Sequence, residues 1–228
     1  MDFGFSEDQE MLRQSARDFL AKECPMTFVR KMMDDETGHS PELWKKMAEL
    51  GWHGLILPEE YGGAGLNFVD LVVILEEMGR VVLPGPFLST VVYGGVTLLE
   101  AGTEAQKKAL LPQIAEGKLV ITLAVLEPSG RWDADGIAAT ATADGGGYRL
   151  DGRWSWCSGL RHSGWIMIGG LVHRDGEDHP DMRLFLVPVS EVKEVEVEVL
   201  PKDSHPAPAS VSKDGIARLA LSLPPGGT

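Results

Sequence analysis

The sequence predicts an α+β protein, in which an all-helical N-terminal domain is followed by a small antiparallel β-sheet or barrel domain. The first observation is that apolar residues recur at three- and four-residue intervals up to about Lys118, which is typical of amphipathic helices. The second is that short β-rich runs, joined by Gly, Pro and Asp turns, follow Lys118. We therefore expect a helical domain over residues 1–118 and a β domain over residues 119–228.

Each helix of the first half is predicted from its start signal or from its apolar face. A capping box, in which Ser6 precedes Gln9, starts the first helix, and Thr103 starts the last helix in the same way. The proline after Ser40 suits the first turn of another helix, and Gly51 suits its left-handed end. The predicted helices follow Ser6, start at Pro41, cover 67–82 and 87–99, and follow Thr103.

Short runs of β-branched and apolar residues predict the strands of the second half. In residues 195–199 valines alternate with glutamates, which indicates a strand with one face in water. Asp144 and the glycines after it mark a tight turn. The predicted strands are 120–125, 139–143, 148–158, 166–172, 184–187, 195–199 and 216–223.

Composition excludes several classes of partner. The chain has 34 acidic and 21 basic residues and a net charge of −13, so its surface repels nucleic-acid phosphates. It contains no basic run for an anionic membrane, and its apolar stretches are too short to cross a bilayer. The two cysteines, Cys24 and Cys157, lie far apart, and no secretory signal precedes them. We therefore expect a cytoplasmic protein with no membrane span.

Taken alone, the clusters of titratable residues indicate surface features. His173 and His179 flank an acidic stretch that is typical of a solvated hairpin turn, and a metal site needs further ligands. The carboxylate pairs at 59–60 and 76–77 are expected at helix ends or on outer faces. These patterns predict neither a metal site nor a catalytic residue.

The tryptophans of the second half leave two interpretations open. Trp154, Trp156 and Trp165 lie within a dozen residues of predicted sheet, and Trp132 lies on a nearby loop. They form either a packed aromatic face or a platform for a flat conjugated ring, since indole has a large polarisable face. Cys157, between them, is expected to be a small hydrophobic residue in a strand.

Several motifs in a fixed order resemble one known family. Residues 57–65 read LPEEYGGAG, and residues 76–80 read EEMGR. Residues 123–128 read LAVLEP, residues 148–152 read YRLDG, and residues 156–158 read WCS. In this order they are similar to motifs of the acyl-CoA dehydrogenase family. That family also consists of a helical domain followed by a β domain.

The resemblance implies a FAD flavoprotein that oxidises an acyl-CoA thioester between its α and β carbons. In the family a base removes the α-proton, the β-hydrogen leaves as hydride to the flavin, and an electron-transfer flavoprotein accepts the electrons. The positions that match imply that Trp156 packs against the isoalloxazine and that Ser158 hydrogen-bonds the flavin ring. With their neighbours, the implied cofactor-binding residues are Leu126, Trp156, Cys157 and Ser158.

The loop after Leu126 departs from the family pattern. Glu127 and Pro128 match the Glu-Pro loop between flavin and acyl-CoA, but Leu126 replaces a hydroxyl residue. Arg131 stands where the family has glycine, and Trp132 stands where it has serine. The resemblance implies substrate-binding roles for Glu127, Pro128, Arg131 and Trp132, and a guanidinium suits phosphate oxygens.

The chain shows no residue that matches the family's glutamate base, which most members carry in a second helical domain after the β domain. We therefore expect a subunit that works in an assembly, either with a homologous acyl-CoA dehydrogenase chain that supplies the helical domain, the base or both, or by self-association. Two alternatives stay open at this point. One is a non-catalytic structural partner of such an enzyme, and the other is a truncated gene product.

Overall fold

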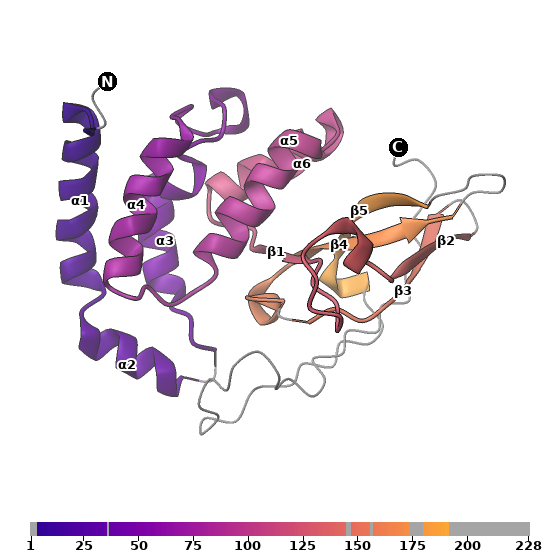
Figure 1. The fold of residues 1–228 in the computed structure, drawn as a ribbon. Coiled ribbons are helices and arrows are strands. Elements are labelled where there is room, and N and C mark those ends of the chain that lie inside the picture. Colours follow the sequence, from indigo (N-terminus) through magenta and orange to yellow (C-terminus); the bar gives the residue numbers. More distant parts are fainter. Residues whose placement is uncertain (1–3, 36, 145–146, 156, 174–179, 192–228) are drawn as a thin grey trace. The chain divides into compact units, whose positions relative to one another are not determined.

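The computed structural model describes residues 4–35, 37–144, 147–155, 157–173 and 180–191. The chain divides into two compact units, one up to Val120 and one from Ile121 onward. The first unit is helical and the second contains a five-stranded sheet, as Figure 1 shows. The predicted α+β class is therefore confirmed. Within the described part of the chain, every helix is too short or too polar to cross a membrane.

The helical unit consists of α-helices, one π-helix and short 3-10 turns. The α-helices are α1 (Glu7–Glu23), α2 (Met26–Asp34), α3 (Pro41–Glu49), α4 (Phe68–Arg80), α5 (Thr97–Ala101) and α6 (Glu104–Ala115). The π-helix η3 (Leu88–Val96) precedes α5, and the 3-10 turns η1 (Trp52–Gly54) and η2 (Glu59–Tyr61) precede α4.

Side-chain caps confirm the helix starts predicted from the sequence. In α1 the Ser6 hydroxyl accepts the Gln9 N–H at 3.2 Å, and the Gln9 side chain accepts the Ser6 N–H at 3.1 Å. Thr103 makes the same capping box on α6, and the Ser40 hydroxyl caps α3. Gly51 adopts a left-handed φ of 76° just after α3.

Two helical segments differ from the prediction. Helix α2 was not predicted, because Pro25 at its N-cap gives no side-chain hydrogen bond and its buried residues are few. The predicted helix 87–99 is present as η3 running directly into α5, but its first part is a π-helix. Periodicity of apolar residues does not distinguish these two helix types over such a short segment.

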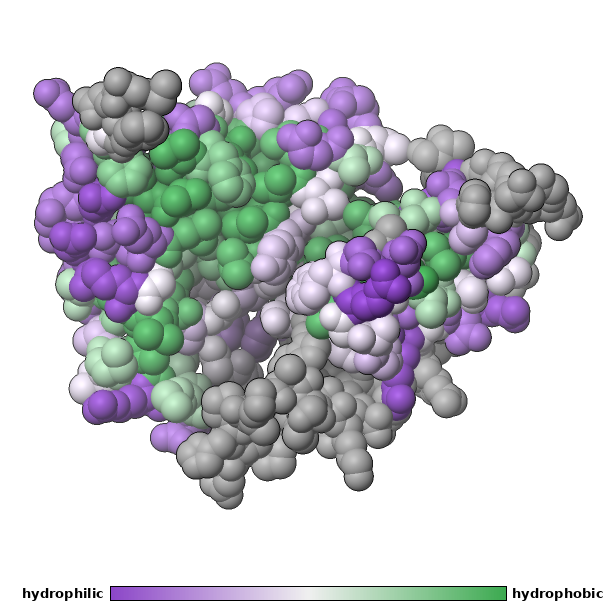
Figure 2. Space-filling view, viewed as in Figure 1, coloured by the Kyte–Doolittle hydropathy of each residue, from purple (hydrophilic) through white to green (hydrophobic). Residues whose placement is uncertain are grey.

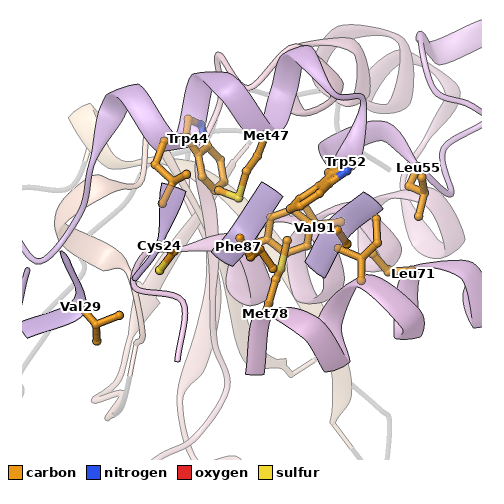
Figure 3. Packing of buried hydrophobic residues seen from close by; sticks show 14 residues of the cluster. Cys24, Val29, Trp44, Met47, Trp52, Leu55, Leu71, Met78, Phe87 and Val91 are labelled. Carbon is orange, nitrogen blue, oxygen red and sulfur yellow. The ribbon is translucent and has the colours of Figure 1, made fainter. Parts of the chain in front are cut away.

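The core of the helical unit is a cluster of aromatic, sulfur-containing and aliphatic side chains (Figure 3). Trp44 and Met47 reach it from α3, Trp52 from η1, and Met78 from α4. Phe87 enters from the residue before η3 and meets Trp44 edge to face, with ring centroids 6.4 Å apart. Burial of each large side chain contributes about 1.5–3 kcal/mol to stability, so these contacts hold the helices together.

His53 is an unusual member of this aromatic core. Its side chain is 0% exposed, and its ring lies 4.0 Å from the Trp44 ring, centroid to centroid. Neither ring nitrogen has a hydrogen-bond partner among the described residues. Burial lowers the pKa of His53 from its ordinary value of 6.5 to about 4, so the ring is neutral at physiological pH.

We expect His53→Phe to raise the free energy of unfolding at pH 7 by about 1 kcal/mol, because it removes buried polar atoms that have no partner. In the wild-type chain, the free energy of unfolding should fall as pH drops from about 6.5 to about 4. In this range His53 binds a proton in the unfolded chain but stays neutral in the folded core. Urea unfolding at several pH values measures both effects. An unchanged pH slope in His53→Phe, with exposed His173→Asn as control, would contradict this assignment.

Glu77 corrects the expectation that the carboxylate pair at 76–77 lies on an outer face. Its side chain is only 2% exposed and accepts hydrogen bonds from Arg17 at 2.6 and 3.0 Å and from Arg80 at 2.8 Å. Hydrogen bonds from Arg17, followed by those from Arg80, lower the pKa of Glu77 to about 2. Glu76 remains exposed, as expected. The sequence pattern could not reveal this arrangement, since Arg17 is 60 residues away in α1.

Part of the helical unit's surface is apolar. Figure 2 shows a broad hydrophobic area on this unit. Exposed hydrophobic side chains occur on α4 and η3 and just before them: Leu66, Phe68, Val69, Val72, Leu88 and Tyr93. Exposed apolar areas of this kind are typical of surfaces that bind another protein.

The second unit is one sheet built around β4. Its strands are β1 (Ile121–Ala124), β2 (Thr140–Asp144), β3 (Gly147–Asp151), β4 (Trp165–Val172) and β5 (Asp181–Pro188). β5 pairs with β4 antiparallel along its whole length. On the other side of β4, β1 and β2 both run parallel to it, and β3 forms an antiparallel hairpin with β2.

The sheet is therefore mixed: two strand pairs are antiparallel, as the predicted antiparallel sheet or barrel requires, but the pairs of β1 and β2 with β4 are parallel and correct that part of the prediction. Alternation within a strand shows which face is buried but carries no information on the direction of its neighbour. The chain passes through the β2–β3 hairpin between β1 and β4, and this long connection lets β1 and β4 run in the same direction. The predicted strands at 195–199 and 216–223, and the glycines at 145–146, lie outside the described residues.

The predicted strand 148–158 is also too long. β3 ends at Asp151, and residues 152–155 form a loop that places Trp154 in the core of the sheet unit. Trp154 is 1% exposed there, and its indole N–H donates to the Gly169 carbonyl of β4 at 3.2 Å. The alternation of aromatic and polar residues led to the prediction of a strand. At Trp154, however, the aromatic residue is a loop side chain that packs into the core.

Candidate functional site

The structure joins two motifs that are about thirty residues apart in the sequence. The Leu126 carbonyl, just beyond β1, accepts the Ser155 N–H at 2.7 Å. Inside β1, the buried Thr122 hydroxyl donates to the Ser158 carbonyl at 2.6 Å. The segment that follows β1, which begins the Leu-Glu-Pro motif, therefore lies beside the described residues 155, 157 and 158. This pair of segments is the candidate site.

Three of the four residues predicted to bind cofactor, Leu126, Cys157 and Ser158, lie in this pair of segments. Leu126 is half-buried and Ser158 is exposed. Cys157 is half-buried, and burial raises the pKa of its thiol to about 11, so the thiol stays protonated. It lies in a loop, not in the predicted strand. Trp156 lies outside the described residues.

Glu127 is buried, although it was expected to face substrate. It is 6% exposed, and both carboxylate oxygens accept the Ala138 N–H at 3.0 Å. One of them also accepts the Ala139 N–H at 3.0 Å. The carboxylate thus joins the start of the loop that follows it to the start of β2. We call residues 128–137 the ligand loop.

The other residues predicted to bind substrate are exposed on the ligand loop. Pro128 is exposed, and Trp132 has 81% of its surface exposed. Arg131 is exposed too, and its guanidinium lies 2.8 Å from the Asp133 carboxylate and 3.4 Å from that of Asp135. A phosphate group would therefore compete with two carboxylates for this guanidinium.

The tryptophans separate into different roles. Trp154 belongs to the packed aromatic interpretation, because it is buried and hydrogen-bonded within the sheet core. Trp165 is half-buried at the first position of β4, and Trp132 is exposed on the ligand loop. His173 is exposed at the end of β4, while His179 lies outside the described residues. The described residues contain no cluster of possible metal ligands.

Thr122 is the residue of this site that the sequence did not reveal. Its burial in β1 and its bond to the Ser158 carbonyl fix the position of the segment that carries Ser158. The one sequence signal for this role was the Thr122 hydroxyl in an otherwise apolar strand, because a buried hydroxyl needs a hydrogen-bond partner.

The loop of residues 57–65 has a structural explanation within the helical unit. Tyr61 is buried, and its hydroxyl donates to the Glu104 carboxylate of α6 at 3.0 Å. Gly62 has a φ of 80°, which favours glycine. At Gly63 a Cβ would lie 2.0 Å from the Leu57 carbonyl oxygen and 2.5 Å from that of Gly54. The backbone at Gly63 therefore passes so close to the carbonyls of Leu57 and Gly54 that no side chain fits at this position.

Comparison with known proteins identifies the family. The profile of the family described as "Acyl-CoA dehydrogenase, N-terminal domain" matches residues 6–118. Acyl-CoA dehydrogenase FadE12 of Mycobacterium tuberculosis is 30% identical over 187 residues, which are 80% of this chain and 47% of that protein. The chain belongs to the acyl-CoA dehydrogenase family. It spans about half the length of the curated relatives it matches.

Solved structures of the acyl-CoA dehydrogenase family have the same fold over both units. The Tcur3481-Tcur3483 steroid ACAD matches with a TM-score of 0.73 at 28% identity, covering 87% of this chain and 52% of that one. An acyl-CoA dehydrogenase from Bacillus anthracis, solved in complex with FAD, matches with a TM-score of 0.72 at 28% identity. That match covers 86% of this chain and 33% of the other.

Proposed function

We propose that this chain is a flavoprotein subunit of an acyl-CoA dehydrogenase-type enzyme. The reaction is α,β-dehydrogenation of an acyl-CoA thioester, with FAD as the hydride acceptor. The single observation that carries this proposal is the junction at which Leu126 binds Ser155 and Thr122 of β1 binds Ser158. Family membership and the FAD complex of the Bacillus anthracis relative support it.

The residues at the junction fit a flavin ring. Ser158 is exposed while its carbonyl is held by Thr122, so its hydroxyl is available to the polar edge of a bound ring. Leu126 and Cys157 offer half-buried, uncharged surface next to it, since the Cys157 thiol stays protonated. FAD, when bound, supplies the redox chemistry, and these side chains orient it. Trp156 retains its proposed role against the ring.

We expect Ser158→Ala to weaken FAD binding about fivefold, which is the value of one neutral hydrogen bond. Titration of FAD followed by flavin fluorescence measures the affinity. Ser190→Ala is the matched control, because Ser190 is an exposed serine of the same unit outside the junction. Equal affinity in wild type and Ser158→Ala would argue against a ring contact by this hydroxyl.

We further propose that the working enzyme is an assembly. Its partner would be a homologous acyl-CoA dehydrogenase chain, or this chain would self-associate. The apolar surface on α4 and η3 supports a protein partner, and the Tcur3481-Tcur3483 steroid ACAD is named after two components. An electron-transfer flavoprotein is the proposed electron acceptor. We also propose that this chain is located in the cytoplasm. Its two cysteines are free thiols, which the reducing cytoplasm maintains.

A second candidate function is a structural subunit that binds no flavin. The pairing of Arg131 with Asp133 and Asp135 favours it, because this pairing neutralises the cation that the ligand loop offers to phosphate. Such a subunit would form the assembly and contain no flavin. Co-purification with a longer homologous chain, followed by assignment of bound flavin to each chain, distinguishes the two functions.

A further inference from the structure

The two ends of the ligand loop are each attached to a different part of the sheet unit. At its start, the Leu126 carbonyl accepts the Ser155 N–H. At its end, the Ala139 carbonyl accepts the Leu171 N–H of β4 at 2.8 Å. Glu127 lies between these attachments and binds the backbone N–H groups of Ala138 and Ala139 through its carboxylate. The carboxylate therefore connects the junction of the candidate site to the central strand.

The ligand loop also has hydrogen bonds of its own. The Gly130 N–H donates to the Glu127 carbonyl at 2.9 Å, and the Ser129 hydroxyl donates to the Gly136 carbonyl at 3.3 Å. A Cβ on Gly136 would lie 2.5 Å from the Arg131 Cβ, so the two sides of the loop pack closely. The loop is therefore packed on itself above the base that Glu127 binds.

We propose that Glu127 is a positioning residue that closes the base of the ligand loop and makes no contact with flavin or acyl-CoA. Its carboxylate is buried against backbone N–H groups, whereas Pro128, Arg131 and Trp132 are exposed on the loop. Glu127 acts by fixing where Leu126, which is predicted to bind cofactor, and those exposed residues lie relative to Ser158. The part of this inference that concerns ligand binding rests on the proposed function.

Hydrogen exchange of the backbone amides tests the closure directly, without any ligand. In Glu127→Ala, exchange at Ala138 and Ala139 should become about tenfold faster or more, because their charged acceptor is removed. Glu127→Gln keeps the size of the side chain and one acceptor oxygen, so its exchange should be intermediate. Exchange in β4 should stay unchanged in both variants and reports whether the sheet is folded.

Asp135→Asn is the matched control. It removes one negative charge from the same loop, but the Asp135 side chain is 86% exposed and makes no bond to the base of the loop. Its exchange at Ala138 and Ala139 should equal that of the wild type. If Glu127→Ala unfolds the sheet, as β4 exchange would show, Glu127→Gln decides the result.

FAD titration then separates the positioning role from simple structural support. In Glu127→Gln, FAD affinity should fall about tenfold with unchanged β4 exchange, which shows that the sheet is still folded. Unchanged exchange at Ala138 and Ala139 would overturn the closure. Faster exchange with unchanged FAD affinity would overturn the positioning role. A wild-type chain that binds no FAD would contradict the proposed function instead, and the exchange data would still decide the closure.

Discussion

Replacing Gly63 by alanine should lower the free energy of unfolding of the helical unit by about 3 kcal/mol. The added Cβ would lie 2.0 Å from the Leu57 carbonyl oxygen and 2.5 Å from the Gly54 carbonyl oxygen. Both obstacles are backbone atoms, so no side-chain rotation relieves the overlap, and the crossing at residues 54–65 must open. Urea unfolding followed by far-UV circular dichroism, which reports mainly on the helices, measures the loss.

Gly79→Ala is the matched control for this substitution. Gly79 lies inside α4, and a Cβ there meets nothing within 4 Å. Alanine should therefore raise stability by about 0.5–1 kcal/mol, since it favours the helix over the unfolded chain. Gly63→Ala with wild-type stability would show that the backbone crossing is not as close as described.

Glu77→Gln should cost the helical unit about 3 kcal/mol, because it breaks a buried ion pair and leaves its partners without a counter-charge. The amide keeps the size of the side chain, so the effect reports charge and hydrogen bonding and not a cavity. Arg17 and Arg80 are about half exposed and reach water, which places the cost at the lower end for buried pairs. Chemical unfolding at pH 7 measures it.

Glu76→Gln is the matched control, since it makes the same change one residue earlier. The Glu76 side chain is 62% exposed and lies 3.4 Å from Arg13, so its loss should cost less than about 0.5 kcal/mol. Equal effects of the two substitutions would contradict the burial of Glu77 between Arg17 and Arg80, an arrangement that we call the Glu77 clamp.

The clamp also has a predictable pH dependence. The pKa of Glu77 is about 2 in the folded chain against an ordinary value of 4.5. Its contribution to stability is therefore complete above about pH 4.5 and is lost as pH falls towards 2. This range lies below the range in which His53 acts, between about pH 6.5 and 4. Acid unfolding of Glu77→Gln should accordingly lack the low-pH part of the transition.

Local signals in the sequence were enough for features whose causes are local. The capping residues Ser6 and Thr103, and the left-handed Gly51, act within a few residues of themselves, and the structure has them as expected. The direction of β1 relative to β4, and the pairing of Glu77 with Arg17, depend on residues far apart in the chain. No periodicity encodes such pairings.

The candidate site divides in the same way. Motif resemblance located the Leu-Glu-Pro segment and Ser158, but it did not show that Thr122 joins them or that Glu127 is buried. A glutamate on a loop next to proline resembles an exposed ligand-binding residue. Only the fold brings the Ala138 and Ala139 N–H groups to its carboxylate.

The visible absorption spectrum of the purified chain, with released flavin counted per chain, tests the central claim most directly. The proposed function predicts a yellow protein that contains, or takes up on addition, about one FAD per chain, because the bonds from Leu126 to Ser155 and from Thr122 to Ser158 are formed within a single chain. A folded chain that remains colourless after incubation with FAD would contradict the claim. That result would favour the structural subunit.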